Sequence, residues 1–445
     1  MNRIIRDPSR EELEQEEDRR LAPYAMRSAR ASRRLPLDRE GRAFDYRTEF
    51  QRDRDRILHS RAFRRLRLKS HGGAIPPAER YRDRLTHTLE VAQLSRTVAR
   101  GLGLNEDLVE AIALGHELGT PPFGRAGEEA LARLLGPEGG GFRYNYQSLR
   151  VVDRLEKRYE HAGINLTDAT REGILKHAAY DDAAPNGAAE REAETLHLDW
   201  APFFEAQVVT AMDLVASVVQ DLDDGLRSGD LEPATVEALP IVRELSRRIG
   251  DSVSRSDGGR MGRGRLFSRA NTINRGLTHM MVTGVIHQSK RALKSWTREH
   301  NVESHEAFLA SRPNVRAGTV GLTPRGRRLY DGLRDFLART LHHGASLSGV
   351  ASRARQLIGG LFRAITEDPR LAEDYLLLRF KEERGGAFLR DLPASRLDDE
   401  IARRYHNDVH FARLVADHIA GMTDPFAISE HDRLLGPFRA VMGAS

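Results

Sequence analysis

The segment EDLVEAIALGHELGTPPFGRAGE, residues 106–128, decides the expected fold. Apolar residues recur through its first half at a spacing of three to four, which is the period of a helix that buries one face. Asn105 stands before this run as a capping residue, and Glu106 falls in the first turn, where an acid favours a helix N-terminus. His116 lies on the apolar row beside Glu117, and a Gly-Thr-Pro-Pro-Phe-Gly turn follows. An adjacent His and Glu on an apolar helix indicate a chemical site rather than ordinary core.

The same helical spacing extends along most of the chain. Strand-like alternation is scarce, and no repeat of about 20–50 residues is evident. We expect helices at residues 50–68, 85–102, 106–118, 126–135, 146–160, 203–225, 281–297, 326–342, 351–366 and 408–421. Clusters rich in Gly, Pro, Ser and charged residues predict loops at residues 71–77, 181–194 and 251–264. The sequence therefore predicts an all-α fold.

Composition limits the class of protein. The chain has 445 residues, of which 40% are hydrophobic and 30% charged, so it can bury a large core. The absence of cysteine excludes disulfides and thiolate metal sites, so a metal must take His and carboxylate ligands. No apolar run approaches the roughly 20 residues of a membrane span, and the N-terminus has no apolar signal segment. We therefore expect a cytoplasmic protein without membrane contact.

Two further positions join His116 and Glu117 as candidate metal ligands. His87 lies on the apolar face of the expected helix 85–102, so its ring points inward. Asp213 lies within a run of apolar residues, where an unpaired carboxylate is costly. One inward histidine is usually a hydrogen-bonded core residue, but two histidines with two carboxylates suit Mn²⁺, Fe²⁺, Zn²⁺ or Mg²⁺. We therefore predict a divalent-metal site at these four residues.

Further stretches carry a resemblance to a known family. They include YRTEFQRDRDR at residues 46–56 and RLTHTLEVAQ at residues 84–93. Through them the chain resembles the deoxyguanosine triphosphate triphosphohydrolase-like branch of the HD superfamily. The matching blocks follow the family order at residues 22–28, 46–56, 59–66, 84–93, 104–114, 147–150, 171–177, 205–209, 221–225 and 419–424.

The resemblance implies an HD-domain helical fold with an additional C-terminal helical lobe. Residues 46–250 would form the HD-domain core with the metal-site scaffold, and residues 265–445 the C-terminal region that completes the fold. Residues 1–45 are charge-dense and poor in apolar periodicity, so we expect an arm that packs late or on a neighbouring subunit. Because family members commonly assemble with sites near subunit interfaces, we also expect a homo-oligomer.

The resemblance implies a reaction as well. Family members hydrolyse a deoxynucleoside triphosphate (dNTP) to the deoxynucleoside and inorganic triphosphate, by attack of water at the α-phosphorus. Their metal is held by a His, an adjacent His-Asp pair and a distant Asp. The corresponding positions of this chain are His87, His116, Glu117 and Asp213. A glutamate that helps proton transfer in the family corresponds to Glu128.

The same resemblance assigns residues to the substrate. Arg84 and Arg125 would bind phosphate charge, and Asp221 would bind the sugar 3′-hydroxyl. Asn145 belongs to the family's Asn-x-Gln-Ser segment and is a further substrate-binding candidate. His71 replaces a family Gln near the sugar and is a candidate proton donor.

The chain departs from the family at positions that the chemistry needs. Glu117 replaces the Asp of the His-Asp doublet, Thr120 and Arg125 replace two histidines, and Tyr144 replaces a third. Thr does not titrate near neutral pH and Arg stays protonated, so neither transfers a proton there. Two functions therefore stay open. One is a dNTP triphosphohydrolase with a divergent active site, and the other is a catalytically impaired pseudoenzyme that acts as a nucleotide sensor or partner subunit.

The charge balance adds a third hypothesis, weak binding of single-stranded DNA. The formal net charge is +5, and most of the basic residues are arginines. Arginines alternate with acids along the chain, however, which is typical of a solvated surface. The phosphates of small nucleotides suit these arginines equally well.

Overall fold

The computed structural model describes residues 9–36, 46–71, 82–178, 196–249, 263–342 and 345–436. These residues form helices joined by turns, with no β-strand among them, so the predicted all-α class is confirmed. The predicted loops at 71–77, 181–194 and 251–264 lie almost wholly outside the described residues. Within the described ranges, no helix is both long and apolar enough to cross a membrane.

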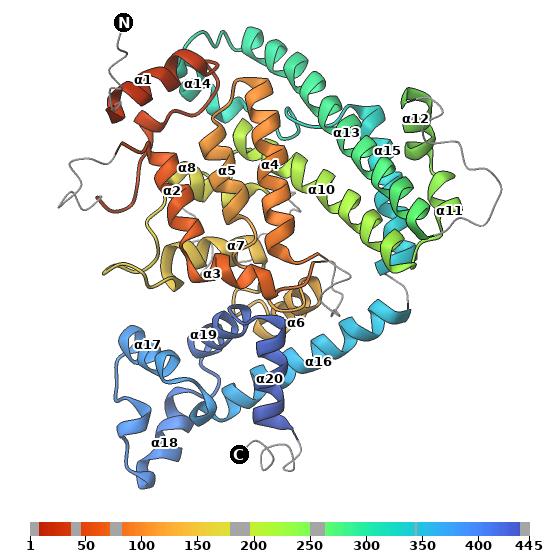
Figure 1. Cartoon of the computed structure of the whole chain (residues 1–445). Coiled ribbons are helices and arrows are strands. Elements are labelled where there is room, and N and C mark those ends of the chain that lie inside the picture. The colour runs from red at the N-terminus through yellow and green to blue at the C-terminus, as the bar shows by residue number, and fades with distance from the viewer. Residues whose placement is uncertain are drawn as a thin grey trace, which may run out of the picture.

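The helices follow one another along the chain as labelled in Figure 1. Their bounds are α1 Arg10–Arg20, α2 Glu49–Leu58, α3 Arg61–Arg65, α4 Arg84–Leu102, α5 Glu106–Gly115, α6 Arg125–Leu135, α7 Tyr144–Arg150, α8 Asp168–Lys176, α10 Phe204–Ser228, α11 Pro233–Glu237, α12 Pro240–Ile249, α13 Arg263–Glu299, α14 His305–Ser311, α15 Pro324–Leu337, α16 Ala345–Glu367, α17 Asp374–Arg384, α18 Ala394–Arg404, α19 Val409–Ala420 and α20 Asp424–Leu435.

Helices α4, α5 and α10 form the centre of the larger part of the molecule (Figure 1). Helix α5 packs against α2 and α4, and α10 packs against α4 and the long helix α13. Their apolar faces are fully buried, at residues that include Val91, Val109, Ile112, Val208 and Met212. Because of this packing, α4, the C-terminal end of α5 and the middle of α10 lie next to one another.

Helix α5 is shorter than the predicted helix 106–118, and its end sets the position of the site. The Asn105 side chain caps its N-terminus, as expected. At its C-terminus Gly115 lies against α8, where a Cβ atom would stand 2.5 Å from Ile174 Cδ1. A larger residue here would therefore force the Ile174 side chain to move. His116 and Glu117 lie in the turn after α5 and not on the helix itself.

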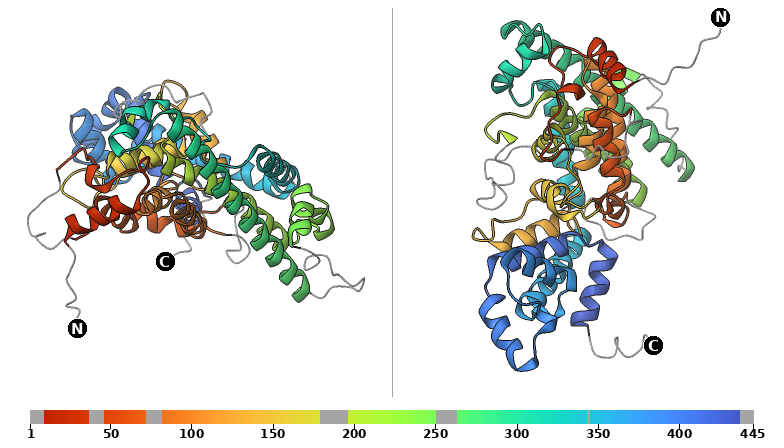
Figure 2. Two further views of the ribbon diagram at one scale, coloured as in Figure 1. Left: turned by 90° about the horizontal axis from the view of Figure 1, so that it is seen from above. Right: turned by 90° about the vertical axis from the view of Figure 1, so that its left-hand side faces the viewer.

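Two clusters of buried apolar side chains divide the molecule. The first includes α2, α4, α5, α8, α10 and α12 to α15, and the second is formed by α6 with α16 to α20. In Figure 1 and in the right-hand view of Figure 2, the blue helices α17 to α20 lie at the end of the molecule opposite α1. This division does not follow the chain order of the predicted regions 46–250 and 265–445. Helix α6 joins the later helices, and α13 to α15 join the earlier ones.

The described part of the expected N-terminal arm packs on its own chain. Glu17 of α1 is buried, and its carboxylate accepts a hydrogen bond from the backbone N–H of Ser28 at 2.7 Å. Arg33 forms ion pairs with Glu49 and Asp53 of α2, each at 2.6 Å. These contacts join the segment to the first cluster.

Two other predicted helices differ from the observed ones for local reasons. The expected helix 50–68 is broken at Ser60, whose hydroxyl accepts the N–H of Phe63 at 3.1 Å and so begins α3. The expected helix 146–160 ends early, because α7 passes into a single π turn at Val151–Leu155.

Candidate metal centre and active site

The ring of His116 is completely buried in the turn after α5. Its Nδ1–H donates to the carbonyl oxygen of Ala113 at 2.5 Å, which leaves the lone pair on Nε2. This Nε2 has no hydrogen-bond partner among the described residues. A buried acceptor without a partner costs about 1–3 kcal/mol. A metal ion bound at Nε2 would remove that cost.

His87 on α4 and Asp213 on α10 lie next to this nitrogen. Asp213 Oδ1 is 3.0 Å from His87 Nε2 and 3.9 Å from His116 Nε2. The other nitrogen of His87 lies 2.7 Å from Gln220 Oε1, and this contact orients the ring. Burial opposes a charge on His87, but the hydrogen bond and charge of Asp213 outweigh it and raise the pKa of His87.

Glu117 supplies a second carboxylate. One of its oxygens, one nitrogen of His87 and one of His116 all lie within 4.8 Å of one another. Arg84 Nη1 donates to Glu117 at 2.5 Å, and the Thr120 hydroxyl donates to the other oxygen. Burial alone would raise the pKa of Glu117, but Arg84 and the two histidines outweigh it and lower the pKa to about 2. The four predicted ligands are therefore brought together, and their imidazole and carboxylate donors fit a divalent cation.

Two further histidines border this ligand group. The ring of His71 stacks on His87 with centroids 4.2 Å apart, and burial lowers the pKa of His71 to about 3. The His177 ring lies 5.0 Å from that of His116, and its Nε2 is 3.0 Å from the Tyr144 hydroxyl. Burial lowers the pKa of His177 to about 4, so both rings are neutral at physiological pH.

His177 is a site residue that the sequence reasoning did not assign. It follows α8, whose last residues include the buried Ile174 and Leu175. The signal available in the sequence is a histidine two residues after an apolar pair, but α8 is too short for its spacing to predict a buried face. Its place beside His116 becomes visible only in the folded chain.

Glu128 and Arg125, the candidates that follow the turn after Glu117, point in different directions. The Glu128 carboxylate accepts the backbone N–H of Tyr144 at 2.9 Å, and burial raises the pKa of Glu128. Arg125 points outward, because its side chain is 90% exposed and forms an ion pair with Glu129 at 3.1 Å. The two residues lie on the same helix, α6, yet only Glu128 faces inward.

The other predicted substrate residues lie around the group. Arg84 Nε donates to the backbone oxygen of Ser70 at 3.1 Å, so its guanidinium is fixed from two sides. Asn145 is buried, and its amide donates to the backbone oxygen of Leu175 at 2.8 Å. Asp221 follows Gln220 on α10, and its charge acts on the ring of His71.

Comparison with known families places this geometry in a class. The HD domain family matches residues 84–224, which contain all four predicted ligands. The phosphohydrolase-associated domain family matches residues 320–433. The fold and the His-carboxylate group are therefore those of an HD-type phosphohydrolase, a metal-dependent class of helical proteins.

Similar proteins show to which family of HD-type phosphohydrolases the chain belongs. The deoxyguanosinetriphosphate triphosphohydrolase-like protein of Ralstonia pickettii is 37% identical over 418 residues, which cover 93% of this chain and 94% of the relative. Deoxyguanosinetriphosphate triphosphohydrolase-like protein 1 of Deinococcus radiodurans is 35% identical over 431 residues, or 96% of this chain and 100% of the relative. The chain belongs to the family of deoxyguanosinetriphosphate triphosphohydrolase-like proteins, which confirms the resemblance seen in the sequence.

Proposed function

We propose that this protein is a metal-dependent hydrolase that converts a dNTP and water into the deoxynucleoside and inorganic triphosphate. The observation that carries the proposal is the buried, unpartnered Nε2 of His116, which lies beside Asp213 and within the ligand group. A divalent cation held there by His87, His116, Glu117 and Asp213 would polarise a phosphoryl oxygen. The relatives' names, which refer to deoxyguanosine triphosphate, support the substrate class.

Glu128 is the residue to which we assign proton transfer. In the proposed reaction the oxygen of water bonds to the α-phosphorus, and the bond from that phosphorus to the 5′ oxygen breaks. The water loses a proton, and the 5′ oxygen takes one up. A carboxyl group whose pKa is raised by burial suits such a transfer near neutral pH. Thr120 does not titrate in this range, and Arg125 faces solvent.

Arg84 is the residue to which we assign binding of the substrate phosphates. Its guanidinium lies beside the ligand group and is held by Glu117 and the Ser70 backbone oxygen, so its position is fixed before substrate arrives. Asp221 and Asn145 remain our candidates for contacts with the sugar and the rest of the nucleotide. Arg125 would reach a phosphate only after leaving its ion pair with Glu129.

One observation favours a second function, that of a nucleotide sensor without catalysis. Arg84 and the Thr120 hydroxyl each bind one oxygen of Glu117. The positive charge of Arg84 already balances the negative charge of Glu117, so a metal ion would compete with Arg84 for this carboxylate. In this alternative the chain binds a dNTP in the same site but does not hydrolyse it.

The metal content of the purified protein, measured together with dNTP hydrolysis, separates the two functions. With Mn²⁺ present, hydrolysis of at least one of the four dNTPs is expected to release deoxynucleoside and triphosphate in equal amounts. Elemental analysis is expected to find bound divalent metal in the same preparation. Nucleotide binding without release of triphosphate would establish the sensor and reject the hydrolase.

Paired variants on α6 test the role of Glu128. Glu128→Gln is expected to lower kcat by roughly 100-fold or more while the bound metal is kept, because general acid-base groups contribute about 10²–10⁴-fold. Glu129→Gln is the matched control, since Glu129 is the neighbouring residue and pairs with Arg125 at the surface. It is expected to change kcat by less than about twofold. Equal effects of the two variants would remove Glu128 from the mechanism.

Two further properties are proposals from the sequence alone. We propose a homo-oligomer, which light scattering of the purified chain tests directly. We also propose that any binding of single-stranded DNA is weak and rests on phosphate charge. Its affinity should then fall steeply with salt concentration, and salt-independent binding would contradict that origin.

A further inference from the structure

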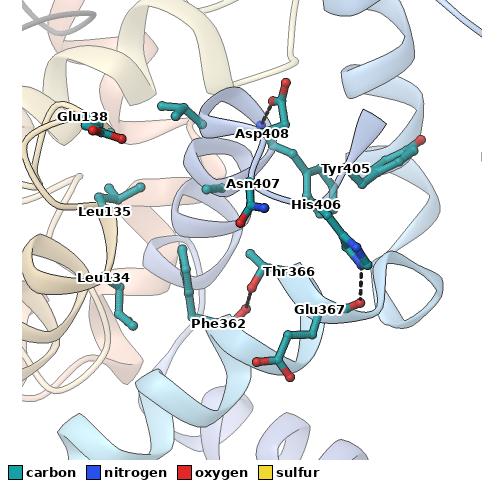
Figure 3. Close-up of a pocket in the computed structure, with 14 residues that line it drawn as sticks. Leu134, Leu135, Glu138, Phe362, Thr366, Glu367, Tyr405, His406, Asn407 and Asp408 are labelled. Carbon is teal, nitrogen blue, oxygen red and sulfur yellow. Dashed lines mark hydrogen bonds between the residues drawn. The ribbon is translucent and has the colours of Figure 1, made fainter. Parts of the chain in front are cut away.

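Two of the cavities among the described residues contact the second apolar cluster, and they differ in charge. The first, of about 520 Å³, lies between α6, α16 and α19 (Figure 3). Its ionisable side chains include Glu138, Glu367 and Asp408, and His406 Nε2 donates to the Glu367 backbone oxygen at 3.0 Å. No lysine or arginine is among its described lining residues. The second cavity, of about 340 Å³, is lined by an excess of cations.

This second cavity is called the interlobe cavity, because the two apolar clusters meet there. One wall is formed by α3 and the segment from α7 to Lys157, and the opposite wall by α17 and α19. Leu118 and Gly119, which follow the ligand Glu117, also line it. Lys69 Nζ donates to the backbone oxygens of Thr120 and Ala420, at 2.5 and 2.8 Å, and so joins the two walls.

The cations of the interlobe cavity outnumber its acids. Arg61, Arg65, Lys157 and Arg379 line it, together with Lys69, which is buried and whose pKa is lowered by burial to about 7. Within the described part of the chain, no carboxylate lies within ion-pair distance of Arg61, Arg65 or Lys157. Among the described residues, Arg65 donates to the backbone oxygen of Gly421 alone, at 3.0 Å.

The two acids of the interlobe cavity already have other partners. The Glu156 carboxylate accepts the backbone N–H groups of Arg61 and Ala62, at 3.2 and 2.7 Å. Asp417 forms an ion pair with Arg150 at 2.8 Å. The acids therefore do not neutralise the exposed cations, and the cavity attracts an anion.

Apolar side chains cover another part of the lining. They belong to Val151, Leu155, Leu376 and Leu414, with the ring of Tyr375 beside them. A cavity of about 340 Å³ is at the lower end of small-molecule sites, which combine an apolar surface with a few charged groups. We propose that the interlobe cavity binds a small organic phosphate, with the phosphate on Arg61, Arg65 and Lys157 and the apolar part against Leu155 and Tyr375.

The binding of phenylphosphonate tests this proposal. The probe carries a phosphate-like dianion on an aromatic ring, and its carbon–phosphorus bond resists hydrolysis by the proposed enzyme. Isothermal titration of the full chain is expected to show saturable binding, tighter than that of inorganic phosphate or of neutral benzyl alcohol. The melting temperature is expected to rise with probe concentration, because a ligand that binds the folded state stabilises it.

Two variants, one on α3 and one in the segment after α7, locate the binding. Arg61→Ala removes an exposed side chain of α3 but keeps the backbone N–H that binds Glu156, and Lys157→Ala removes an exposed side chain of the segment after α7. Each is expected to weaken phenylphosphonate binding by about fivefold or more, because each removes a charge-assisted contact. Arg64→Ala is the control, since Arg64 is exposed on the same helix and does not line the cavity. It is expected to leave the affinity within about twofold.

The outcomes are decisive in both directions. Weaker binding in Arg61→Ala and Lys157→Ala with unchanged binding in Arg64→Ala supports the site. Equal affinities in all variants, or no preference for phenylphosphonate over inorganic phosphate, would overturn it. Because these measurements do not use dNTP turnover, the inference stands or fails independently of the proposed function.

Discussion

The ligand group and the segment that follows it, residues 119–128, are built differently. This segment is the turn after Glu117 together with the first residues of α6. In the ligand group His87, His116 and Glu117 are buried, and each histidine has one nitrogen held by the protein. In that segment Thr120 donates to Glu117, and Arg125 at the start of α6 faces solvent. The difference indicates that imidazole and carboxylate donors are gathered in the ligand group, whereas few groups in the following segment are suited to proton transfer.

The largest expected effect is on the ligand group. His116→Ala removes the unpartnered Nε2 and is expected to lower metal affinity by at least about 100-fold, because loss of a ligand's outer partner alone costs about 10–100-fold. Competition titration with a metal indicator measures it. His406→Ala, at an exposed histidine of the C-terminal lobe, is the control. Unchanged metal affinity in His116→Ala would show that His116 is not a metal ligand.

A second prediction compares two carboxylates on α10, the fully buried Glu205 and the partly buried Asp213. Histidines hold the pKa of Asp213 below its usual range despite burial, whereas burial raises the pKa of Glu205 to about 7. Because the folded pKa of Glu205 exceeds the unfolded value of 4.5, its contribution to stability is fully present below pH 4.5. That contribution is lost as the pH rises through 7.

Glu205→Gln tests this dependence. Between about pH 4.5 and 7 the wild type is expected to lose roughly 2–3 kcal/mol that the variant does not lose. Urea unfolding at several pH values measures the difference. If the free energy of unfolding changes with pH in the same way for both proteins, burial does not raise the pKa of Glu205. The difference in pKa between Glu205 and Asp213 would then be smaller than proposed.

A third prediction concerns the contact that orients His87. Gln220→Ala removes the acceptor of the His87 Nδ1–H and is expected to weaken metal binding about tenfold. Gln220→Glu keeps an acceptor oxygen and is expected to restore most of the affinity. If both variants bind metal like the wild type, the ring of His87 is held by packing alone.

The smallest expected effect is at Arg125, on the solvent-facing side of α6. Arg125→Ala is expected to change kcat and KM by less than about twofold, because the side chain is 90% exposed and pairs with Glu129. Steady-state kinetics with the preferred dNTP measures it. A tenfold rise in KM would show that Arg125 leaves its ion pair to bind phosphate, and that the turn contributes more than its geometry indicates.

Much of the fold could be predicted from the sequence, because long helices with one apolar face leave a clear spacing. Helices α4, α6 and α10 lie within a few residues of their predicted bounds. Helices α8 and α14 were not predicted because they are too short to define an apolar face. Helices α17 and α18 were not predicted because the leucines of α17 stand consecutively at residues 376–378 and α18 is mostly charged. Their burial depends on partners far away in the chain.

The ligands could be proposed from residue type, but their partners could not. The pairing of Arg84 with Glu117 and the position of His177 beside His116 depend on how α4, α5 and α8 pack. The assignment of Arg125 to the substrate followed its position in the family pattern, whereas its direction follows from its place on α6. Spacing along the chain therefore identifies the donors, and packing decides what each donor contacts.

Anomalous diffraction from crystals of this protein grown with Mn²⁺ tests the central claim most directly. The account predicts one strong manganese peak within roughly 2.3 Å of His87 Nε2, His116 Nε2 and a carboxylate oxygen of both Glu117 and Asp213. A peak that contacts the histidines and Asp213 but not Glu117, with Glu117 still bound to Arg84, would contradict the assigned fourth ligand. The absence of any peak at His116 would contradict the metal centre itself.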